Sequence, residues 1–499
     1  MAYETKSLSE DIKEFKTDKM SVPALFFMSQ DLLPEEETFA QVEDIAGNKD
    51  TFFRSTVAMP DVCSKPGRKN AAGTTIASEK YILPQVNDSD PNCGMRLVKT
   101  SLNEDNITPA EIHRLFQELV AVVPTKKFVG TTVPFSVVVD ICRQGTKAII
   151  KHLNIQTKNE LENTQCGGSF FEKEMTRQDI FDVIPKLYLG FAKYRLGIIG
   201  AAGNHFLDLM KVGEIADPVM AEKMGIKKGQ YLFMIHTGSG ILGQYTMYTH
   251  TAKKAEHFSQ ALMVALGKLT FSSKKKAVYE KMQEKIRMHM TKDDTLLKYD
   301  ANGEDGEMYM NARAAASNFG TANRAVITHN IAETIKKLLG RDPQLDLIYD
   351  LPHISITREE HFGKEVMIHR SNTSRAYGPS RMSHHPIYKE TGEPAFIPSS
   401  MSTDAYICVG TDRNDQSFFS APHGTGKGKN NNEKSIASKE ELFAKMEEKG
   451  IRLYNAQSSI VINQDSARYK NIDQVIKGVE ANGVAHVVAK MQPVAVLMY

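Results

Sequence analysis

The chain has 499 residues, of which 41% are hydrophobic and 24% are charged, and its net charge is +2. These values are ordinary for a soluble globular protein with ample material for a large core, and they exclude a general polyanion-binding signature, so nucleic-acid binding would need local basic patches. The polar N-terminus, the lack of an apolar run long enough to span a bilayer, and five cysteines without paired spacing argue against secretion and membrane spanning and predict a cytoplasmic protein.

Capping signals predict the helices. One helix begins after Thr108, where Pro109 occupies the first turn and Glu111 the capping-box position. Further helices are predicted from about residue 176, over residues 278–290, and from residue 438 to a stop at residue 450. An Ala-rich helical stretch begins at residue 311 and is expected to close at residues 320–324, where we predict close packing rather than chemistry.

Short apolar runs predict strands at residues 231–235, 345–349, 406–409 and 494–497. Helical and strand-like segments are intermixed, which favours an α+β or α/β architecture. The sequence contains no internal repeat and no clear linker, so we expect one large domain.

The segment Asp90-Pro91-Asn92-Cys93-Gly94 places a carboxylate and a thiol three residues apart. This pair of a hard oxygen and a soft sulfur suits Mn, Zn or Fe better than Mg, because Mg avoids thiolate. The same residue types are also typical of a simple turn.

Four of the fifteen histidines lie at the ends of predicted strands or in glycine-bearing turns, namely His205, His236, His353 and His423. A ligand at a strand end is held rigidly while its tip reaches a cleft. Each histidine alone reads as a polar residue at a strand end, but together with Asp90 and Cys93 they predict a two-metal site. His423 lies in a glycine-rich loop, where a histidine can be a nucleophile toward phosphorus or a simple turn residue.

Two polar segments, residues 371–375 and 398–403, suit phosphate or nucleotide contacts and equally suit ordinary Ser/Thr turns. Seven segments then occur in a fixed order: D-P-N-C-G-M-R at 90–96, G-N-H-F-L-D at 203–208, I-H-T-G-S-G-I-L-G at 235–243, Y-D-L-P-H-I at 349–354, T-S-R-A-Y at 373–377, P-S-S-M-S-T-D-A-Y at 398–406 and S-A-P-H-G-T-G-K at 420–427. In order and spacing they resemble the motifs of the RtcB family of RNA ligases, from about residue 60 to the C-terminus.

This resemblance implies an α+β fold: one RtcB-like ligase domain over residues 1–499, with central β-sheets flanked by helices and residues 1–59 as an N-terminal extension of the same domain. It also implies a ligase that uses GTP and two Mn²⁺ ions to join RNA 3′-phosphate or 2′,3′-cyclic phosphate ends to 5′-hydroxyl ends, in tRNA splicing or RNA repair. Asp90, Cys93 and His353 would bind one Mn²⁺ ion. Cys93, His205 and His236 would bind the other, with the thiolate bridging the two.

His423 is implied to be the nucleophile that accepts GMP from GTP. The RNA 3′-phosphate would then attack the guanylylated histidine, and the 5′-hydroxyl would displace GMP from the activated end. The residues implied to contact the guanylate are Asn204, His205, Phe206, Leu207, Asp208, Pro398, Ser399, Ser400, Met401, Gly424, Thr425, Gly426 and Tyr469.

The chain departs from the family pattern in several phosphate and guanine contacts, which marks a divergent member. Gly240 stands at the position of the arginine in the family's H-S-G-S-R loop. Lys427 stands at another arginine position, and its ammonium keeps the charge but cannot donate two parallel hydrogen bonds as a guanidinium does. The other departures are Cys63 for histidine, Ile354 for asparagine, Ala405 for serine and Met498 for lysine.

Two alternatives remain open on these departures: a metal-binding RNA-end sensor that has lost ligation, and a dinuclear metal phosphoesterase. The expected partners are RNA, with broken or spliced tRNA as substrate, and GTP, without a membrane. The residues leave open whether an activating protein partner is required and whether the chain is a monomer or a weak oligomer.

Overall fold

The structure is a computed structural model that describes residues 3–87, 89–125, 128–200, 204–292, 296–428, 438–456 and 459–499. Helices and strands are mixed along the chain, so the predicted α+β class is confirmed. No helix within the described ranges is both long and apolar enough to cross a membrane.

The larger sheet has eight strands in the order β11-β7-β9-β8-β19-β16-β15, with β18 beside β19. All four predicted strands fall on this sheet, on β9, β11, β16 and β19, and buried apolar side chains cover both of its faces. The strands are β7 (Gly94–Asn103), β8 (Phe206–Ile215), β9 (Gln230–Thr237), β11 (Asp346–Pro352), β15 (Pro394–Ile397), β16 (Ala405–Gly410), β18 (Arg452–Asn455) and β19 (Ala485–Met498).

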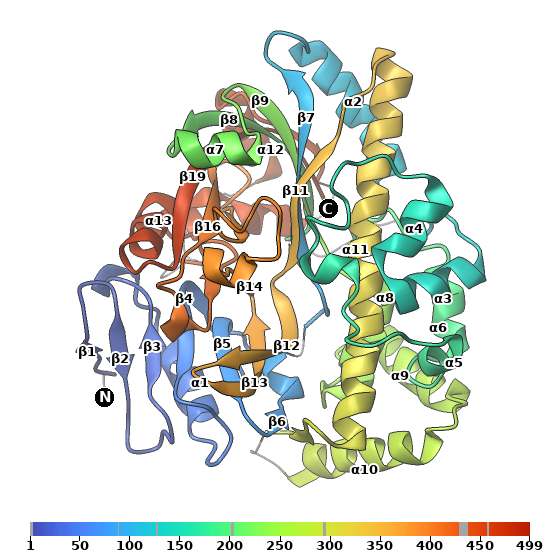
Figure 1. Cartoon of the computed structure of the whole chain (residues 1–499), viewed down its shortest axis with the longest axis vertical. Coiled ribbons are helices and arrows are strands. Elements are labelled where there is room, and N and C mark those ends of the chain that lie inside the picture. The colour runs from blue at the N-terminus through green and yellow to red at the C-terminus, as the bar shows by residue number, and fades with distance from the viewer. Residues whose placement is uncertain are drawn as a thin grey trace.

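The second sheet has seven strands in the order β1-β2-β3-β4-β5-β13-β12, and its N-terminal strands form the lower left of Figure 1. Its strands are β1 (Lys6–Ser7), β2 (Lys13–Phe15), β3 (Ala24–Phe26), β4 (Thr56–Cys63), β5 (Ala72–Ser78), β12 (Ile354–His361) and β13 (Lys364–Ser371). Two short ribbons pair β6 (Tyr81–Ile82) with β10 (Tyr299–Asp300), and β14 (Thr373–Arg375) with β17 (Ser420–Pro422). Residues 373–375 are therefore a strand, where a polar loop was predicted.

One long helix, α11 (Glu304–Leu339), runs through the molecule between the sheets and a cluster of helices (Figure 1). Its neighbours include α2, α3, α4, α8 and α10. The remaining helices are α1 (Glu36–Ala46), α2 (Pro109–Val122), α3 (Phe135–Gln144), α4 (Thr146–Leu153), α5 (Arg177–Phe181), α6 (Lys186–Ala192), α7 (Pro218–Met224), α8 (Gly240–His250), α9 (Phe258–Thr270), α10 (Lys276–Lys292), α12 (Lys439–Glu448) and α13 (Ile472–Ala481).

The predicted helix starts are confirmed, because Thr108, Thr176 and Ser438 each cap their helix with a side-chain hydrogen bond. The predicted helix end at residues 320–324 is wrong, because α11 continues to Gly340. Gly320 lies inside this buried helix, and a Cβ there would lie 3.3 Å from the carbonyl oxygen of Asn92. The glycine therefore lets the segment that carries Cys93 approach the helix closely, rather than ending the helix.

Candidate active site

Four of the predicted metal ligands lie together where neighbouring strands of the larger sheet begin or end. Strands β11, β7, β9 and β8 are neighbours, and their register places Gly94 opposite both Pro352 and Thr237. Phe206 lies opposite His236 in the same way. Cys93 precedes β7, His205 precedes β8, His236 lies in β9 and His353 follows β11. Residues far apart in sequence therefore meet because antiparallel pairing brings these strand ends to one edge.

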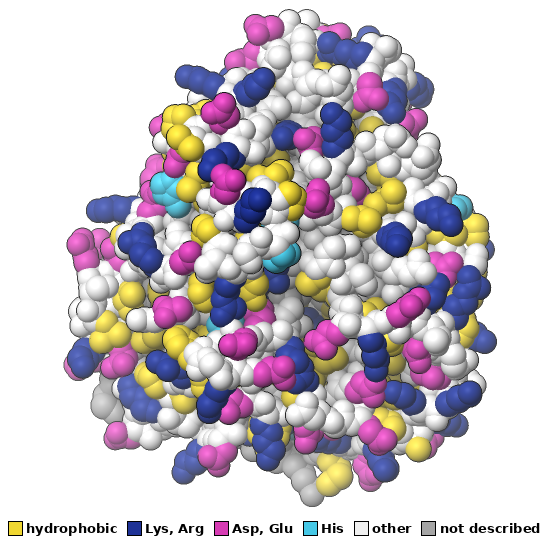
Figure 2. Space-filling view, viewed as in Figure 1, with side chains coloured by type: hydrophobic (Ala, Val, Ile, Leu, Met, Phe, Trp, Pro, Cys, Tyr) yellow, Lys and Arg dark blue, Asp and Glu magenta, His cyan; other side chains and the backbone are white. Residues whose placement is uncertain are grey.

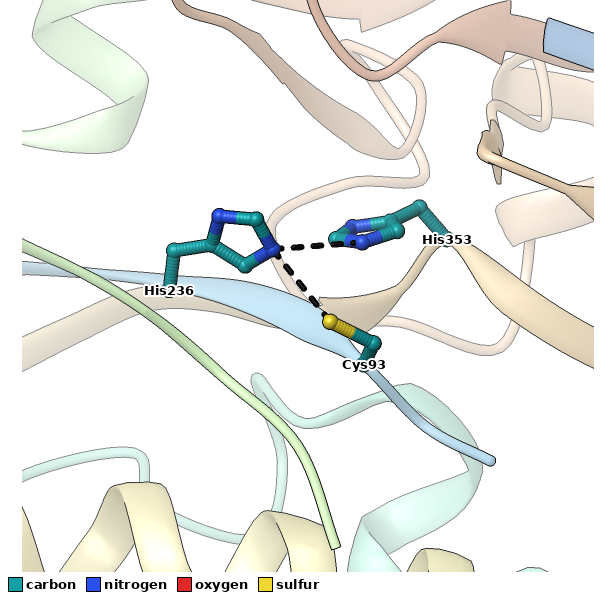
Figure 3. A group of neighbouring side chains, drawn as sticks. All are labelled: Cys93, His236 and His353. Atoms are coloured by element: carbon teal, nitrogen blue, oxygen red, sulfur yellow. Dashed lines mark hydrogen bonds between the residues drawn. The ribbon is translucent and has the colours of Figure 1, made fainter. Parts of the chain in front are cut away.

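The Cys93 thiol contacts two of the imidazoles. Its Sγ atom is 3.3 Å from Nε2 of His205 and 3.3 Å from Nε2 of His236, and Figure 3 shows the second of these contacts. Nε2 of His236 is also 3.3 Å from Nε2 of His353, and the donor atoms of Cys93, His236 and His353 all lie within 4.8 Å of one another. These side chains are buried, and their donor atoms face one another within a small space.

The electrostatics of this group fit a cation. Burial holds the pKa values of His236 and His353 well below the usual value and lowers the pKa of His205 to about 4, so the three imidazoles are neutral. Nδ1 of His205 donates to the carbonyl of Ile199 at 2.9 Å, which leaves the Nε2 lone pair facing the thiol. Burial raises the pKa of the Cys93 thiol, whereas a coordinated cation would deprotonate it. Convergent lone pairs around a sulfur suit a divalent transition metal.

Asp90 lies beside this group rather than within it. Its carboxylate accepts hydrogen bonds from the Ser239 hydroxyl at 2.5 Å and from the Gly240 backbone N–H at 3.4 Å. Burial raises the pKa of Asp90 to about 6. The predicted metal residues are thus brought together, with the oxygen ligand held at the rim by the start of α8.

Arg324 connects the segments that carry the ligands. This fully buried side chain of α11 donates to the carbonyls of Asn92 at 3.0 Å and Thr237 at 2.8 Å, and to the carboxylate of Asp350 at 2.6 Å. These three partners lie beside Cys93, beside His236 and on β11. The prediction of packing alone for residues 320–324 therefore missed a positioning residue.

His423 follows β17. Its Nδ1 lies 2.6 Å from Oδ2 of Asp61, so an Nδ1–H group there donates to the carboxylate. In the neutral ring this hydrogen bond leaves the lone pair on Nε2, which lies 3.4 Å from the amide nitrogen of Asn372. The ring centroid of His423 is 4.6 Å from that of His353, so the candidate nucleophile borders the candidate metal group.

Asp61 is a functional candidate that the sequence reasoning did not assign. It lies on β4, 362 residues before His423. A carboxylate inside the buried apolar run of β4, beside Met59 and Val62, was the available signal, because a buried charge needs a partner.

A cavity of about 390 Å³ opens on His423 and His236. This volume is typical of a small-molecule site. Eleven of the predicted nucleotide residues line it, namely Asn204, Phe206, Asp208, Pro398, Ser399, Ser400, Met401, Gly424, Thr425, Gly426 and Tyr469. Ala405 and Met498 line it as well.

Two predicted nucleotide residues do not line this cavity. Leu207 points to the opposite face of β8 and packs in the core with Leu209 and Phe233, because side chains alternate along a strand. His205 faces the thiol instead. Asp208, on the cavity side, has one carboxylate oxygen without a hydrogen-bond partner among the described residues, and burial raises its pKa well above the usual value. Such a carboxyl group suits a polar ligand edge.

The loop after His423 is held close to Asp61. Gly426 has φ +68°, and a Cβ there would lie 2.4 Å from the carbonyl oxygen of Asp61. Only glycine fits this approach. Lys427 follows, with its ammonium 4.0 Å from the centroid of the Tyr469 ring, and burial lowers its pKa to about 8.

The sequence of the chain is similar to one family model and to several individual proteins. Residues 41–498 match the family model described as tRNA-splicing ligase RtcB. The RtcB tRNA-splicing ligase of Nanoarchaeum equitans is 28% identical over 509 aligned residues, covering 97% of this chain and 96% of that protein. That of Archaeoglobus fulgidus is 28% identical over 498 aligned residues, covering 96% and 94%. The counterpart from Pyrococcus horikoshii is 30% identical over 427 aligned residues, covering 81% of this chain but only 44% of that longer protein.

Proposed function

The chain belongs to the RtcB family, and we propose that it is a GTP- and Mn²⁺-dependent ligase that joins RNA 3′-phosphate or 2′,3′-cyclic phosphate ends to 5′-hydroxyl ends. The arrangement of His423 supports this proposal most directly. Its Nε2 lone pair is exposed by the Asp61 contact and lies where a nucleotide-sized cavity meets the Cys/His group. The names of the relatives favour tRNA splicing, and broken or spliced tRNA is the substrate we propose.

We propose that Asp90, Cys93 and His353 hold one Mn²⁺ ion, and that Cys93, His205 and His236 hold the second. When bound, these ions would neutralise the charge of the phosphates near His423. The protein's own contribution is to fix the ligands on rigid strand ends and to keep the imidazoles neutral.

The proposed first step forms a bond between Nε2 of His423 and the α-phosphorus of GTP and breaks the bond from that phosphorus to pyrophosphate. The Nδ1 proton stays on the ring, where Asp61 stabilises the cationic ring as its other nitrogen becomes phosphorylated. An RNA 3′-phosphate oxygen then attacks the same phosphorus and releases His423. The 5′-hydroxyl finally attacks the RNA phosphate, and GMP leaves.

The cavity residues support the choice of a purine nucleotide. We propose that the unpartnered oxygen of Asp208 accepts from the N–H donors of guanine, and that Ser399, Ser400 and the loop 424–426 contact its sugar and phosphate. A neutral carboxyl group at this depth also becomes charged more readily when such donors bind it.

A joining assay tests the proposed function. A 3′-phosphorylated RNA and a 5′-hydroxyl RNA are incubated with the protein, GTP and Mn²⁺, and the expected result is a joined strand that needs all five components. Phosphate release without joining would instead support the phosphoesterase alternative. RNA binding without covalent guanylate would support the RNA-end sensor.

Asp61→Asn is expected to slow guanylylation of the protein by roughly 100-fold or more. The amide cannot stabilise the charged ring, and it can present an N–H that favours the wrong tautomer. The rate is measured with labelled GTP in single-turnover conditions. Asp140→Asn, on α3 and paired with Arg143 and Arg177 rather than with a histidine, is the matched control that should keep the wild-type rate; an unchanged rate in Asp61→Asn would contradict the role of Asp61.

Affinity for GTP is expected to fall as pH rises through about 8, the pKa to which burial lowers Lys427. Below this value the ammonium is protonated and attracts phosphate, and above it the charge is lost. Bound phosphate shifts this transition upward but cannot reverse its sign. Titrations of GTP binding at pH 7 and pH 9.5 should differ by roughly tenfold. Lys427→Met should bind as weakly as wild type does at high pH and show a flat profile; a wild-type profile in this variant would contradict the assignment.

The five free cysteines support our proposal that the protein acts in the reducing cytoplasm. A monomer or weak oligomer and an activating protein partner remain the expectations for its assembly.

A further inference from the structure

A second cavity, of about 550 Å³, also borders the candidate metal group and shares Lys65, Asn204 and Asn372 with the nucleotide cavity. Asp90, Cys93 and His205 line one part of it, so it reaches the same ligands as the nucleotide cavity. Arg68 and Arg195 line another part. The cavity therefore joins two guanidinium groups to the proposed metal ligands.

Gly240 leaves open space in this cavity. Its φ is +59°, and a Cβ built there would meet no atom within 4 Å. The family motif has an arginine at this position, and this chain has no side chain to offer a phosphate. Basic and acidic side chains are intermixed on the face of the molecule that Figure 2 shows.

We propose that this second cavity binds the terminal phosphate of the RNA 3′ end, and that Arg68 and Arg195 supply the charge that Gly240 cannot. The proposal deepens the proposed function and rests on it for the identity of the RNA. Guanidinium groups suit this ligand because they recognise phosphate oxygens through parallel N–H donors.

Both arginine side chains are held by contacts with neighbouring residues. Nη1 of Arg68 donates to the Ser89 hydroxyl at 2.5 Å, next to Asp90 in sequence. Nη1 of Arg195 donates to the carbonyl of Phe128 at 2.8 Å, and its guanidinium lies over the Phe128 ring at 5.0 Å. Anchoring of this kind lowers the entropy lost when a ligand binds.

One further cation, Lys65, contributes to the lining of both cavities. Ser239 and Gly240, at the start of helix α8, also line this cavity, and there the Asp90 carboxylate accepts their hydrogen bonds. The cavity also places a terminal phosphate beside the metal ligands, where the second step requires it.

Binding of two probes tests the proposal: a short single-stranded RNA with a 3′-phosphate, and the same RNA with a 3′-hydroxyl, each with Mn²⁺ present. The wild type should bind the phosphorylated probe more tightly. Arg68→Gln and Arg195→Gln should each reduce this preference by about tenfold, and the slope of log affinity against log salt should fall by about 0.7 per lost contact. Lys69→Ala, the neighbouring cation that does not line the cavity, should keep the wild-type preference.

Wild-type preference in both arginine variants, with melting temperatures confirming that they fold, would overturn the proposal. Guanylylation measured on the same wild-type preparation separates the two claims. Guanylylation without any preference for the 3′-phosphate would contradict only this cavity assignment. A preference lost in the arginine variants, without guanylylation of the wild type, would contradict only the proposed function.

Discussion

Cys93→Ser is expected to lower Mn²⁺ affinity by more than about 100-fold and to abolish guanylylation, because a change to a direct ligand should exceed the 10–100-fold cost typical of its supporting partners. The Cys93 sulfur is the atom that two imidazoles approach at 3.3 Å. A serine hydroxyl is smaller, harder and far more difficult to deprotonate, so it cannot replace a thiolate shared by two ions. Calorimetric titration with Mn²⁺ measures the affinity, and labelled GTP measures the covalent step.

Cys408→Ser is the matched control, since Cys408 is equally buried but lies in the core under the seven-stranded sheet. This control should lose some stability, through burial of a hydroxyl, and keep wild-type Mn²⁺ affinity. If Cys93→Ser bound Mn²⁺ as the wild type does, the thiol would not be a ligand and the two-metal assignment would fail.

Arg324→Met is expected to lower the free energy of unfolding by about 3–5 kcal/mol, the usual cost of removing one partner of a buried ion pair. Its guanidinium and the Asp350 carboxylate are both fully buried, and Asp350 would keep only Arg96 as a charged partner. The carbonyls of Asn92 and Thr237 would also lose their donor. Denaturant titration measures the stability, and Mn²⁺ titration of the folded variant should show weakened binding as well.

Arg375→Met separates the positioning role of Arg324 from simple destabilisation. Arg375 pairs with the buried Glu393 and, unlike Arg324, its guanidinium donates to no backbone carbonyl beside a proposed metal ligand among the described residues. This variant should also lose stability, but its folded form should keep wild-type Mn²⁺ affinity. Equal Mn²⁺ affinity in the Arg324 and Arg375 variants would contradict a positioning role for Arg324.

The residues of the candidate metal group could be predicted from the sequence, because the pattern that marks each residue lies within a few positions of it. Each histidine lies at the end of an apolar run or in a glycine-bearing turn, and Cys93 lies in a short segment with its own carboxylate. The strand ends are fixed by the same apolar runs, so local pattern and tertiary position agree. The sequence pattern does not predict the order of the strands. That order brings His236 and His353 together beside Cys93.

The contacts that orient the site could not be predicted in this way, because they join distant segments. Asp61 and His423 are 362 residues apart, and the sequence around each residue does not indicate that the other is its partner. The role of Arg324 was hidden for a different reason. Gly320 is an ordinary helix-ending signal, yet α11 is buried on all sides there and continues, since tertiary packing outweighs the propensity of one glycine.

Side-chain direction explains the remaining differences. The motif at 203–208 implies five consecutive contacts, at residues 204–208, but a strand presents only alternate residues to one face. Phe206 and Asp208 therefore line the nucleotide cavity, while Leu207 lies in the core. The departures at Cys63, Ala405, Lys427 and Met498 line the same cavity, whereas Gly240 and Ile354 line the second cavity beside the proposed metal ligands, so the divergence surrounds both cavities.

The central claim is that His423 becomes covalently guanylylated, and one measurement tests it most directly. The protein is incubated with Mn²⁺ and GTP labelled at the α-phosphorus, and the labelled peptide is identified by mass spectrometry. We expect an acid-labile, alkali-stable GMP adduct on His423. This adduct should be absent in His423→Ala and form slowly in Asp61→Asn. Absence of the adduct from Mn²⁺-loaded wild-type protein, or an adduct that persists in His423→Ala, would contradict this claim.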